Sequence, residues 1–266
     1  MKRTVSVEIK NQVAIVSIDR EEKLNPLSSQ VFHDLESIFN ELEKSSIIGA
    51  ILTGQGERSF IAGADISEMK KMTSEEGKAF SAKAQALTQK IENFYYPVIA
   101  CVNGFALGGG LEFALCCDFI YATENAKFGQ PEVKLGLIPG FGGCVRLTRI
   151  VGPQMSKEII YSGELLSSDQ ALALKIANKV FPTKSEMVTA AISKLELIGK
   201  NSLSAVRYSK GAINDSFGKS TTLALSIENE YFFKTFVSDD KEIGTTAFLE
   251  KRSPTFSHQV GLRELH

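Results

Sequence analysis

Alternating apolar and polar residues at the start of the chain predict a β-hairpin. Residues 5–10 and 13–18 have the two-residue period of strands, and Asn11-Gln12 forms a two-residue connection between them. From about residue 28 to 44 apolar residues recur at spacings of three and four, which predicts an amphipathic helix. Its apolar residues are Val31, Phe32, Leu35, Ile38, Phe39 and Leu42.

Strands and helices continue to alternate up to about residue 150. The predicted elements are strands at residues 48–53, 97–102, 119–122 and 126–128, a loop at 59–69 and a helix at about 74–92. This alternation favours an α/β fold, in which helices pack outside a layered and mainly parallel sheet.

Beyond Gly152 the pattern predicts helices alone. Ser167 and Gln170 have the spacing of a capping box at the start of one helix. Apolar stripes continue into a tail that is rich in phenylalanine, at Phe232, Phe233 and Phe236. A short helical segment cannot bury so many apolar faces alone. We therefore expect the tail to pack on the first part of the chain or on other subunits.

Composition and charge narrow the class of protein. A chain of 266 residues, 43% of them hydrophobic, suggests one large domain or a domain with an appendage. The net charge of −1 argues against a dedicated nucleic-acid binder, although it leaves room for a local basic pocket that binds a phosphate. The first residues lack the apolar core of a signal peptide. The most apolar stretch, residues 98–117, contains Glu112 and four glycines, which a membrane-spanning helix would tolerate poorly. We expect a soluble, cytoplasmic protein that does not bind membranes.

The cysteines and histidines offer little support for a metal site. There is no C-x-x-C pair, so we expect buried free thiols in a reducing compartment rather than disulfides or zinc ligands. The four cysteines are Cys101, Cys116, Cys117 and Cys144. The three histidines lie far in sequence from the glycine-rich segments, so neither a histidine triad nor a metal centre is expected. They are His33, His258 and His266.

Two glutamates carry the strongest chemical signal. Glu112 follows three glycines and has apolar neighbours, where a carboxylate loses hydration unless it has a partner or a task. Glu132 follows Gly129-Gln130-Pro131 and precedes another glycine-rich segment. Taken alone, Glu132 could equally be a glutamate in a surface turn. Brought together, the two carboxyl groups could hold one water molecule, one removing its proton while the other supplies a proton elsewhere.

Two main-chain N–H groups are candidate ligands for a developing negative charge. The small residues around Ala64 let the backbone approach a ligand, and the N–H of Gly109 lies at the expected start of a helix. Together they would form an oxyanion hole. The alternative for the Ala64 segment is an ordinary loop after a strand, and the alternative for the glycines around Gly109 is that they only form a turn. For Asp118 we expect a structural role, as a cap or an ion-pair partner.

Four segments occur in one order and at close spacing, at residues 62–66, 103–112, 128–132 and 136–143. In this combination the chain strongly resembles the crotonase, or enoyl-CoA hydratase/isomerase, family. The resemblance extends from Arg20 to Arg252. It implies a crotonase (ClpP-like) spiral of β-β-α units with a helical C-terminal trimerisation region. It divides the chain into a core at 1–195 that holds the acyl-CoA site and a helical oligomerisation region at 196–266. It also implies a homo-trimer, or a hexamer that is a dimer of trimers.

The resemblance implies an enoyl-CoA hydratase that adds water reversibly across the trans-2 double bond of an enoyl-CoA thioester. In this family the N–H groups matching Ala64 and Gly109 bind the thioester oxygen, and the glutamates matching Glu112 and Glu132 hold the water. No metal or redox cofactor is expected, since coenzyme A is part of the substrate. Substrate-binding candidates by resemblance are Lys23, Leu24, Ala62, Gly63, Asp65, Ile66, Phe248 and Lys251. By the same resemblance Lys251, near Phe248, is expected to reach the site of a neighbouring subunit.

Two alternatives stay open. One is an isomerase, or another family enzyme such as a ring-forming synthase, that acts on a coenzyme A thioester. Many family isomerases keep only one of the two carboxylates. The other is an RNA-binding member of the fold, which the acidic helix at 28–44 disfavours because a basic face would be needed.

Two departures from the family pattern stand out. Lys175 replaces a glycine that usually ends a helix, and Cys144-Val145 stands where Thr-Gln is common. The acyl pocket is expected to be shaped by Met69, Met72, Phe141 and the helix after Ser74.

Overall fold

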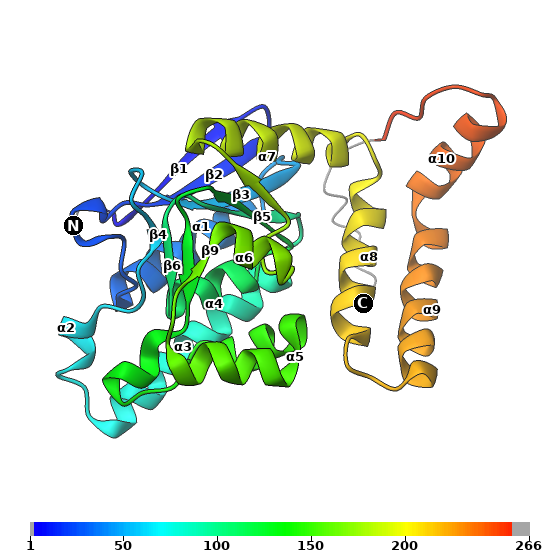
Figure 1. Cartoon of the computed structure of the whole chain (residues 1–266). Helices are drawn as coiled ribbons and strands as arrows, with labels where there is room; N and C mark the ends of the chain where they lie inside the picture. The colour runs from blue at the N-terminus through cyan, green and yellow to red at the C-terminus, as the bar shows by residue number, and fades with distance from the viewer. Residues whose placement is uncertain (1–2, 257–266) are drawn as a thin grey trace.

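The computed structural model describes residues 3–256 of the chain. A two-sheet α/β body forms one side of the molecule, and three C-terminal helices form the other (Figure 1). None of the helices within the described residues has the length and apolar character needed to span a bilayer.

The larger sheet has six strands in the order β1-β2-β3-β5-β7-β10. The predicted hairpin is present, with β1 (Val5–Lys10) antiparallel to β2 (Val13–Ile18) and Asn11 and Gln12 at the turn, both with positive φ. The four strands that follow are parallel to β2. They are β3 (Gly49–Gly54), β5 (Val98–Val102), β7 (Phe119–Thr123) and β10 (Lys179–Phe181).

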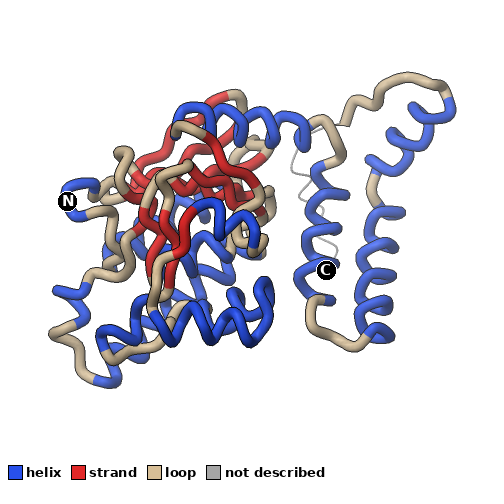
Figure 2. The backbone as a smooth tube through the Cα atoms, viewed as in Figure 1, coloured by secondary structure: helices blue, strands red, loops and turns tan. Residues whose placement is uncertain are grey.

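The smaller sheet has the order β4-β6-β8-β9, and its strands cross those of the larger sheet (Figure 2). Its members are β4 (Ser59–Ile61), β6 (Phe105–Leu107), β8 (Lys127–Gly129) and β9 (Leu166–Ser167). Three times, a strand of the larger sheet is followed by a strand of the smaller sheet and then by helix. This repetition is the spiral of β-β-α units that the sequence resemblance implied.

The first long helix begins and packs as its sequence predicts. In α1 (Ser29–Leu42) the Ser28 hydroxyl accepts the Val31 N–H at 3.4 Å, and the predicted apolar stripe is buried. A complete capping box between Thr73 and Glu76 starts α3 (Ser74–Glu92). The loop expected at 59–69 is partly wrong, because it contains β4 and α2 (Ile66–Met69). Elements of three or four residues are too short to show a period in the sequence.

The expectation of helices alone beyond Gly152 is also wrong, because β9 and β10 extend both sheets. β9 and β10 can be only two and three residues long, because each adds to a strand, β8 or β7, that is already part of a sheet. The remaining helices of the body are α4 (Gly109–Leu115), α5 (Gly143–Ser162), α6 (Ser168–Ala173) and α7 (Lys184–Gly199). The Ser167–Gln170 capping box begins α6 as predicted.

Lys175 ends α6 in the conformation that a glycine usually supplies. Its φ is 61°, its N–H donates to Leu172 O at 3.0 Å, and the Ile176 N–H donates to Ala171 O at 2.8 Å. These two bonds form a Schellman motif. The helix therefore terminates as in the family pattern, with a side chain held in the left-handed region.

The C-terminal helices are α8 (Leu203–Ser216), α9 (Thr221–Val237) and α10 (Asp239–Leu249). Polar contacts hold α8 on the body: Lys210 Nζ lies 2.9 Å from Asp118 Oδ2 and donates to Tyr96 O at 3.4 Å, and Asn214 Nδ2 donates to Glu92 O at 3.1 Å. Asp118 also accepts the Val98 N–H, so its expected structural role is confirmed. In Figure 1, α9 and α10 lie on the far side of α8 from the body. The division expected at 195/196 falls inside α7 and stays a prediction.

The cysteines only partly follow the prediction. All four are free thiols, and Cys101 and Cys116 are buried. Cys117 is half-buried and Cys144, in the first turn of α5, is exposed, which corrects the expectation that all are buried. Within residues 3–256, no three His, Cys, Asp or Glu side chains are grouped so that they could hold a metal ion.

Candidate active site

Three neighbouring parallel strands of the smaller sheet position the candidate residues. β6 pairs with β4 on one side and with β8 on the other. Ala64 comes three residues after β4, Gly109 two residues after β6, and Glu132 three residues after β8. Since the carboxyl ends of parallel strands lie at the same edge of a sheet, the segments far apart in sequence meet there.

Glu112 lies in α4, directly after β6, with only 1% of its surface exposed. Its Oε1 atom accepts the main-chain N–H groups of Phe141 at 2.7 Å and of Gly143 at 2.6 Å. Burial raises the pKa of the Glu112 carboxyl from its usual 4.5 to about 7, while these hydrogen bonds and the charge of Arg146 act in the opposite direction. A carboxyl with a pKa near 7 can exchange protons at neutral pH.

Glu132 lies in the short helix η2 (Pro131–Leu135) and is half-buried. A Cβ atom placed on Gly108 would come within 2.9 Å of Glu132 Oε1, so only glycine, here with φ 52°, lets the carboxyl approach this closely. Burial is the main cause that raises the pKa of Glu132 from 4.5 to about 7, and the charge of Glu112 raises it further. Because each charge affects the other, the two carboxyls titrate as a pair.

The buried Gln130 side chain contacts the Glu132 carboxyl. In the amide orientation that satisfies its hydrogen bonding, its nitrogen donates to both oxygens of Glu132 at 2.9 and 3.1 Å. A Cβ atom on Gly143, whose N–H binds Glu112, would come within 2.6 Å of the same amide. Gln130 therefore orients Glu132 next to the segment whose N–H groups bind Glu112.

The N–H groups of Ala64 and Gly109 are available to a ligand. Among the described residues, neither donates to a main-chain or side-chain acceptor. The Gly109 N–H is in the first turn of α4, where helix geometry provides no internal acceptor. The backbone around Ala64 is fixed by its neighbours, since the Asp65 N–H donates to Leu27 O at 2.7 Å. The arrangement provides two fixed donors beside two carboxyl groups.

The remaining candidates from the sequence fall into two groups. Leu24 and Ala62 are joined by a 3.1 Å hydrogen bond beside Gly63 and Ala64, and the exposed Lys23 immediately precedes them. The Asp65 carboxylate forms an ion pair with Arg20 at 2.9 Å and accepts the Ser67 hydroxyl, and these contacts lower its pKa. The side chain of Asp65 is thus engaged by the protein itself, whereas that of Ile66 is exposed.

Phe248 and Lys251 are not brought to this site within one chain. Phe248 is 82% exposed on α10, and Lys251 follows it with φ 56°. In Figure 1, α10 and α2 lie at opposite ends of the molecule. A contact between Lys251 and the site would therefore need a second copy of the chain.

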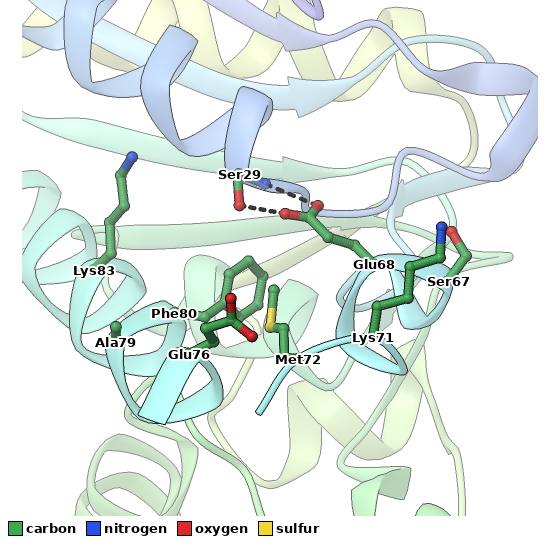
Figure 3. Close-up of a pocket in the computed structure, with 9 residues that line it drawn as sticks. All are labelled: Ser29, Ser67, Glu68, Lys71, Met72, Glu76, Ala79, Phe80 and Lys83. Atoms are coloured by element: carbon green, nitrogen blue, oxygen red, sulfur yellow. Dashed lines mark hydrogen bonds between the residues drawn. The ribbon is translucent and has the colours of Figure 1, made fainter. Parts of the chain in front are cut away.

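A pocket of about 640 Å³ opens beside α2 and α3, lined by nine side chains that include Met72, Phe80 and Lys83 (Figure 3). Met72 and α3 thus line a pocket, as the sequence suggested, but Met69 and Phe141 do not. Neither catalytic candidate lines it. The ring of Phe141 packs 5.7 Å from that of Phe80, and a Cβ atom on Gly109 would come within 2.8 Å of the same Phe141 ring. The aromatic rings thus stand between Gly109 and the pocket.

Several residues of the site were not predicted from the sequence. The Phe141 and Gly143 N–H groups that bind Glu112 belong to a glycine-rich segment that was noted, but no pattern shows which N–H groups face a carboxylate. Gln130 lies two residues before Glu132 in a segment that carries the family resemblance, and this position was an available signal, whereas its burial is seen only in the structure.

Comparisons with known proteins identify the family to which the chain belongs. The family model for enoyl-CoA hydratase/isomerase matches residues 8–259. The short-chain-enoyl-CoA hydratase of Clostridium acetobutylicum is 43% identical, over 93% of this chain and 95% of its own length. The crotonyl-CoA hydratase of Syntrophomonas wolfei is 40% identical, over 95% and 97%. The crystal structure of an enoyl-CoA hydratase from Bacillus anthracis superposes with a TM-score of 0.91 at 33% identity, covering 96% of this chain and 100% of that one.

Proposed function

The chain belongs to the enoyl-CoA hydratase/isomerase family, and on that premise we propose that it adds water reversibly across the trans-2 double bond of an enoyl-CoA thioester. It is an enzyme of the enoyl-CoA hydratase type. The observation that carries the proposed mechanism is a pair of carboxyls, Glu112 and Glu132, each with a pKa raised to about 7, beside the N–H groups of Ala64 and Gly109, which have no acceptor within residues 3–256.

The N–H groups of Ala64 and Gly109 bind the thioester oxygen and draw electrons from the conjugated double bond. When water attacks the β-carbon, negative charge moves to that oxygen, where the two donors stabilise it. Donors of this kind contribute on the order of 3–4 kcal/mol each to the transition state. Since they are fixed by the fold, little reorganisation is needed during the reaction.

The two glutamates handle the protons. Ionised Glu112 takes a proton from the water as its oxygen bonds to the β-carbon, and protonated Glu132 delivers a proton to the α-carbon. Similar pKa values suit this exchange, because one proton shared by two carboxyls gives one base and one acid at neutral pH. All groups in these steps belong to the chain, the water and the substrate.

Two carboxyls support hydration over isomerisation, because shuttling a proton along the substrate needs only one of them. The substrate is an enoyl-CoA with a short acyl chain. The Phe141 ring supports this, because it packs against Gly109 and obstructs the path of a longer acyl chain toward α3. The names of two relatives support it as well.

Assembly and location complete the proposal. The exposed phenylalanines of α9 and α10 support a trimer, or a dimer of trimers, in which Lys251 and Phe248 contact the coenzyme A bound by a neighbour and Lys23 contacts that bound by its own subunit. The free thiols support a reducing, cytoplasmic location.

The test is hydration of crotonyl-CoA by the purified chain, followed by the loss of absorbance of the conjugated thioester. We expect Glu112→Gln and Glu132→Gln each to lower turnover by at least about a hundredfold, the scale of general acid–base catalysis. Both variants should stay folded by circular dichroism. Near-normal hydration by either folded variant would rule out the two-glutamate mechanism. Turnover of a 3-enoyl-CoA without hydration would favour the isomerase, and RNA binding in a gel shift the nucleic-acid alternative.

A further inference from the structure

One face of α3 holds the turn that binds Glu112. Ser81, Gln85 and Thr88 lie on this face at spacings of four and three, so they line up along the helix. The Ser81 hydroxyl and the Gln85 amide donate to Gly140 O at 2.6 and 2.8 Å. The Thr88 hydroxyl donates to Phe141 O at 3.3 Å. The carbonyl side of the 140–143 turn is therefore held by α3.

Arg146 completes this support from α5. Its side chain is only 11% exposed and forms an ion pair with Glu92 on α3, with Nη2 2.6 Å from Oε2 and Nε 3.4 Å from Oε1. Its other terminal nitrogen, Nη1, donates to Thr88 Oγ1 at 3.1 Å and to Phe141 O at 3.3 Å. A Cβ atom on Gly142 would come within 2.3 Å of Nη1, and Gly142 has φ 120°, so the guanidinium lies directly under the turn.

The opposite side of the same turn faces the candidate catalytic carboxyl, since the N–H groups of Phe141 and Gly143 both bind Glu112 Oε1. We propose that Arg146, fixed by Glu92, is a positioning residue for Glu112: it holds the turn so that two N–H groups keep the carboxylate aimed at the water. This rests on the proposed function, because it assigns the residue a part in the same reaction.

Two effects of Arg146 on Glu112 can be separated. The cation favours the ionised form of Glu112 and so lowers its pKa, and the paired guanidinium fixes the turn. The other charged or titratable groups around them are Glu92 on α3, Glu132 on η2, Cys116 on α4 and Cys144 on α5. Of these, only Glu92 pairs directly with Arg146.

The experiment compares Arg146→Gln and Arg146→Lys with Arg149→Gln as the matched control. Arg149 is an exposed arginine three residues further along α5, and its guanidinium lies over the Phe217 ring. Three quantities are measured: kcat and KM for crotonyl-CoA, and the titration midpoint of the Glu112 carboxyl by NMR of protein labelled at the glutamate carboxyl carbon. Glu112→Gln identifies the resonance.

For Arg146→Gln we expect kcat to fall about tenfold or more, because a loosened carboxylate loses its alignment. KM should stay within about twofold, since neither Arg146 nor the N–H groups of the turn are assigned a contact with the substrate. The Glu112 midpoint should rise. Arg146→Lys should keep the midpoint near that of the wild type and still lose turnover, because a lysine cannot reproduce the paired guanidinium contacts. Arg149→Gln should match the wild type in kcat, in KM and in the Glu112 midpoint.

Equal kcat and equal Glu112 midpoint in Arg146→Gln and Arg149→Gln would overturn the inference. If Arg146→Gln fails to fold, Thr88→Val decides, since it keeps the Arg146–Glu92 ion pair and removes the hydroxyl that accepts from Arg146 Nη1 and donates to Phe141 O. Lowered kcat at unchanged KM supports positioning, and wild-type kcat overturns it. A wild-type protein without hydratase activity would instead refute the proposed function, while the NMR comparison would still report whether Arg146 acts on Glu112.

Discussion

At the scale of single residues, burial of the Glu112 carboxyl opposes folding at neutral pH. The carboxyl has a pKa near 4.5 in the unfolded chain and about 7 in the folded one. Between these values the folded protein holds a proton that the unfolded chain has released. Stability therefore falls as pH rises from about 4.5 to about 7, and the loss is complete above that range.

We predict that Glu112→Gln is more stable than the wild type above pH 7, by at most about 3 kcal/mol, because the amide is never ionised. The advantage should shrink toward pH 4.5, where the wild-type carboxyl is protonated in both states. Urea denaturation across this range measures it. A stability difference that does not change with pH would contradict the assignment of the raised pKa to Glu112. Glu132→Gln serves as the comparison, with the same direction expected.

The Phe141 ring gives a prediction about substrate length. Replacing it with leucine or alanine should open space between Gly109 and Phe80 while keeping the main-chain N–H that binds Glu112. We expect the ratio of kcat/KM for an eight-carbon enoyl-CoA to that for crotonyl-CoA to rise at least about tenfold, since even one additional methylene that fits the pocket is worth about 1–3 kcal/mol. Phe113→Leu is the control, because that ring stacks on Phe32 in the same cluster. An unchanged ratio in Phe141→Ala would show that the ring does not limit chain length.

At the scale of elements, hydrophobic periodicity correctly predicted the helices and strands that are long enough to show a repeating pattern. The hairpin, α1 and α3 were expected within a few residues because apolar and polar residues alternate over several turns or strand positions. β9 and β10 were not predicted. Leu166–Ser167 and Lys179–Phe181 are too short to show the two-residue period of a strand, and they form only by pairing with strands that are already in a sheet. The glycine-rich segments marked the site, but the contacts that α3 makes with the 140–143 turn depend on a fold that a linear pattern does not describe.

Lys175 yields a prediction about one helix end. A side chain in the left-handed region costs about 1 kcal/mol, and glycine avoids this cost at the end of a helix. Lys175→Gly should therefore raise the free energy of unfolding by about 1 kcal/mol. The exposed Lys157 inside α5 is a matched control, where the same substitution should lower it by about 1 kcal/mol. Thermal or urea melts would check both, and destabilisation by Lys175→Gly would contradict the strain argument.

At the scale of the whole molecule, α8 packs on the body, while α9 and α10 leave large apolar side chains exposed. α8 is fixed by polar contacts to the body. No residue of α9 is buried, and its Phe232, Phe233 and Phe236 are each more than half exposed. Three neighbouring exposed rings on one helix are typical of a protein interface.

We predict a trimer, or a hexamer built from trimers, at micromolar concentration in sedimentation experiments. Phe233→Glu should shift the population to smaller species, because it buries a charge in the apolar contact. Ile9→Glu on β1 is a control at a similarly exposed apolar residue outside the tail, and it should leave the assembly intact. A wild-type monomer at this concentration would contradict the prediction.

The hydrogen bonds of Glu112 also bear on the handedness of the product. Because Glu112 Oε1 accepts two N–H donors, the proposed mechanism assigns the water proton to Oε2. In that mechanism the planar enoyl group, held at its oxygen by the N–H groups of Ala64 and Gly109, presents one face to the water. We therefore expect addition to create a single configuration at the β-carbon, so that the enzyme makes one enantiomer of the hydroxyacyl thioester and, in reverse, dehydrates only that one.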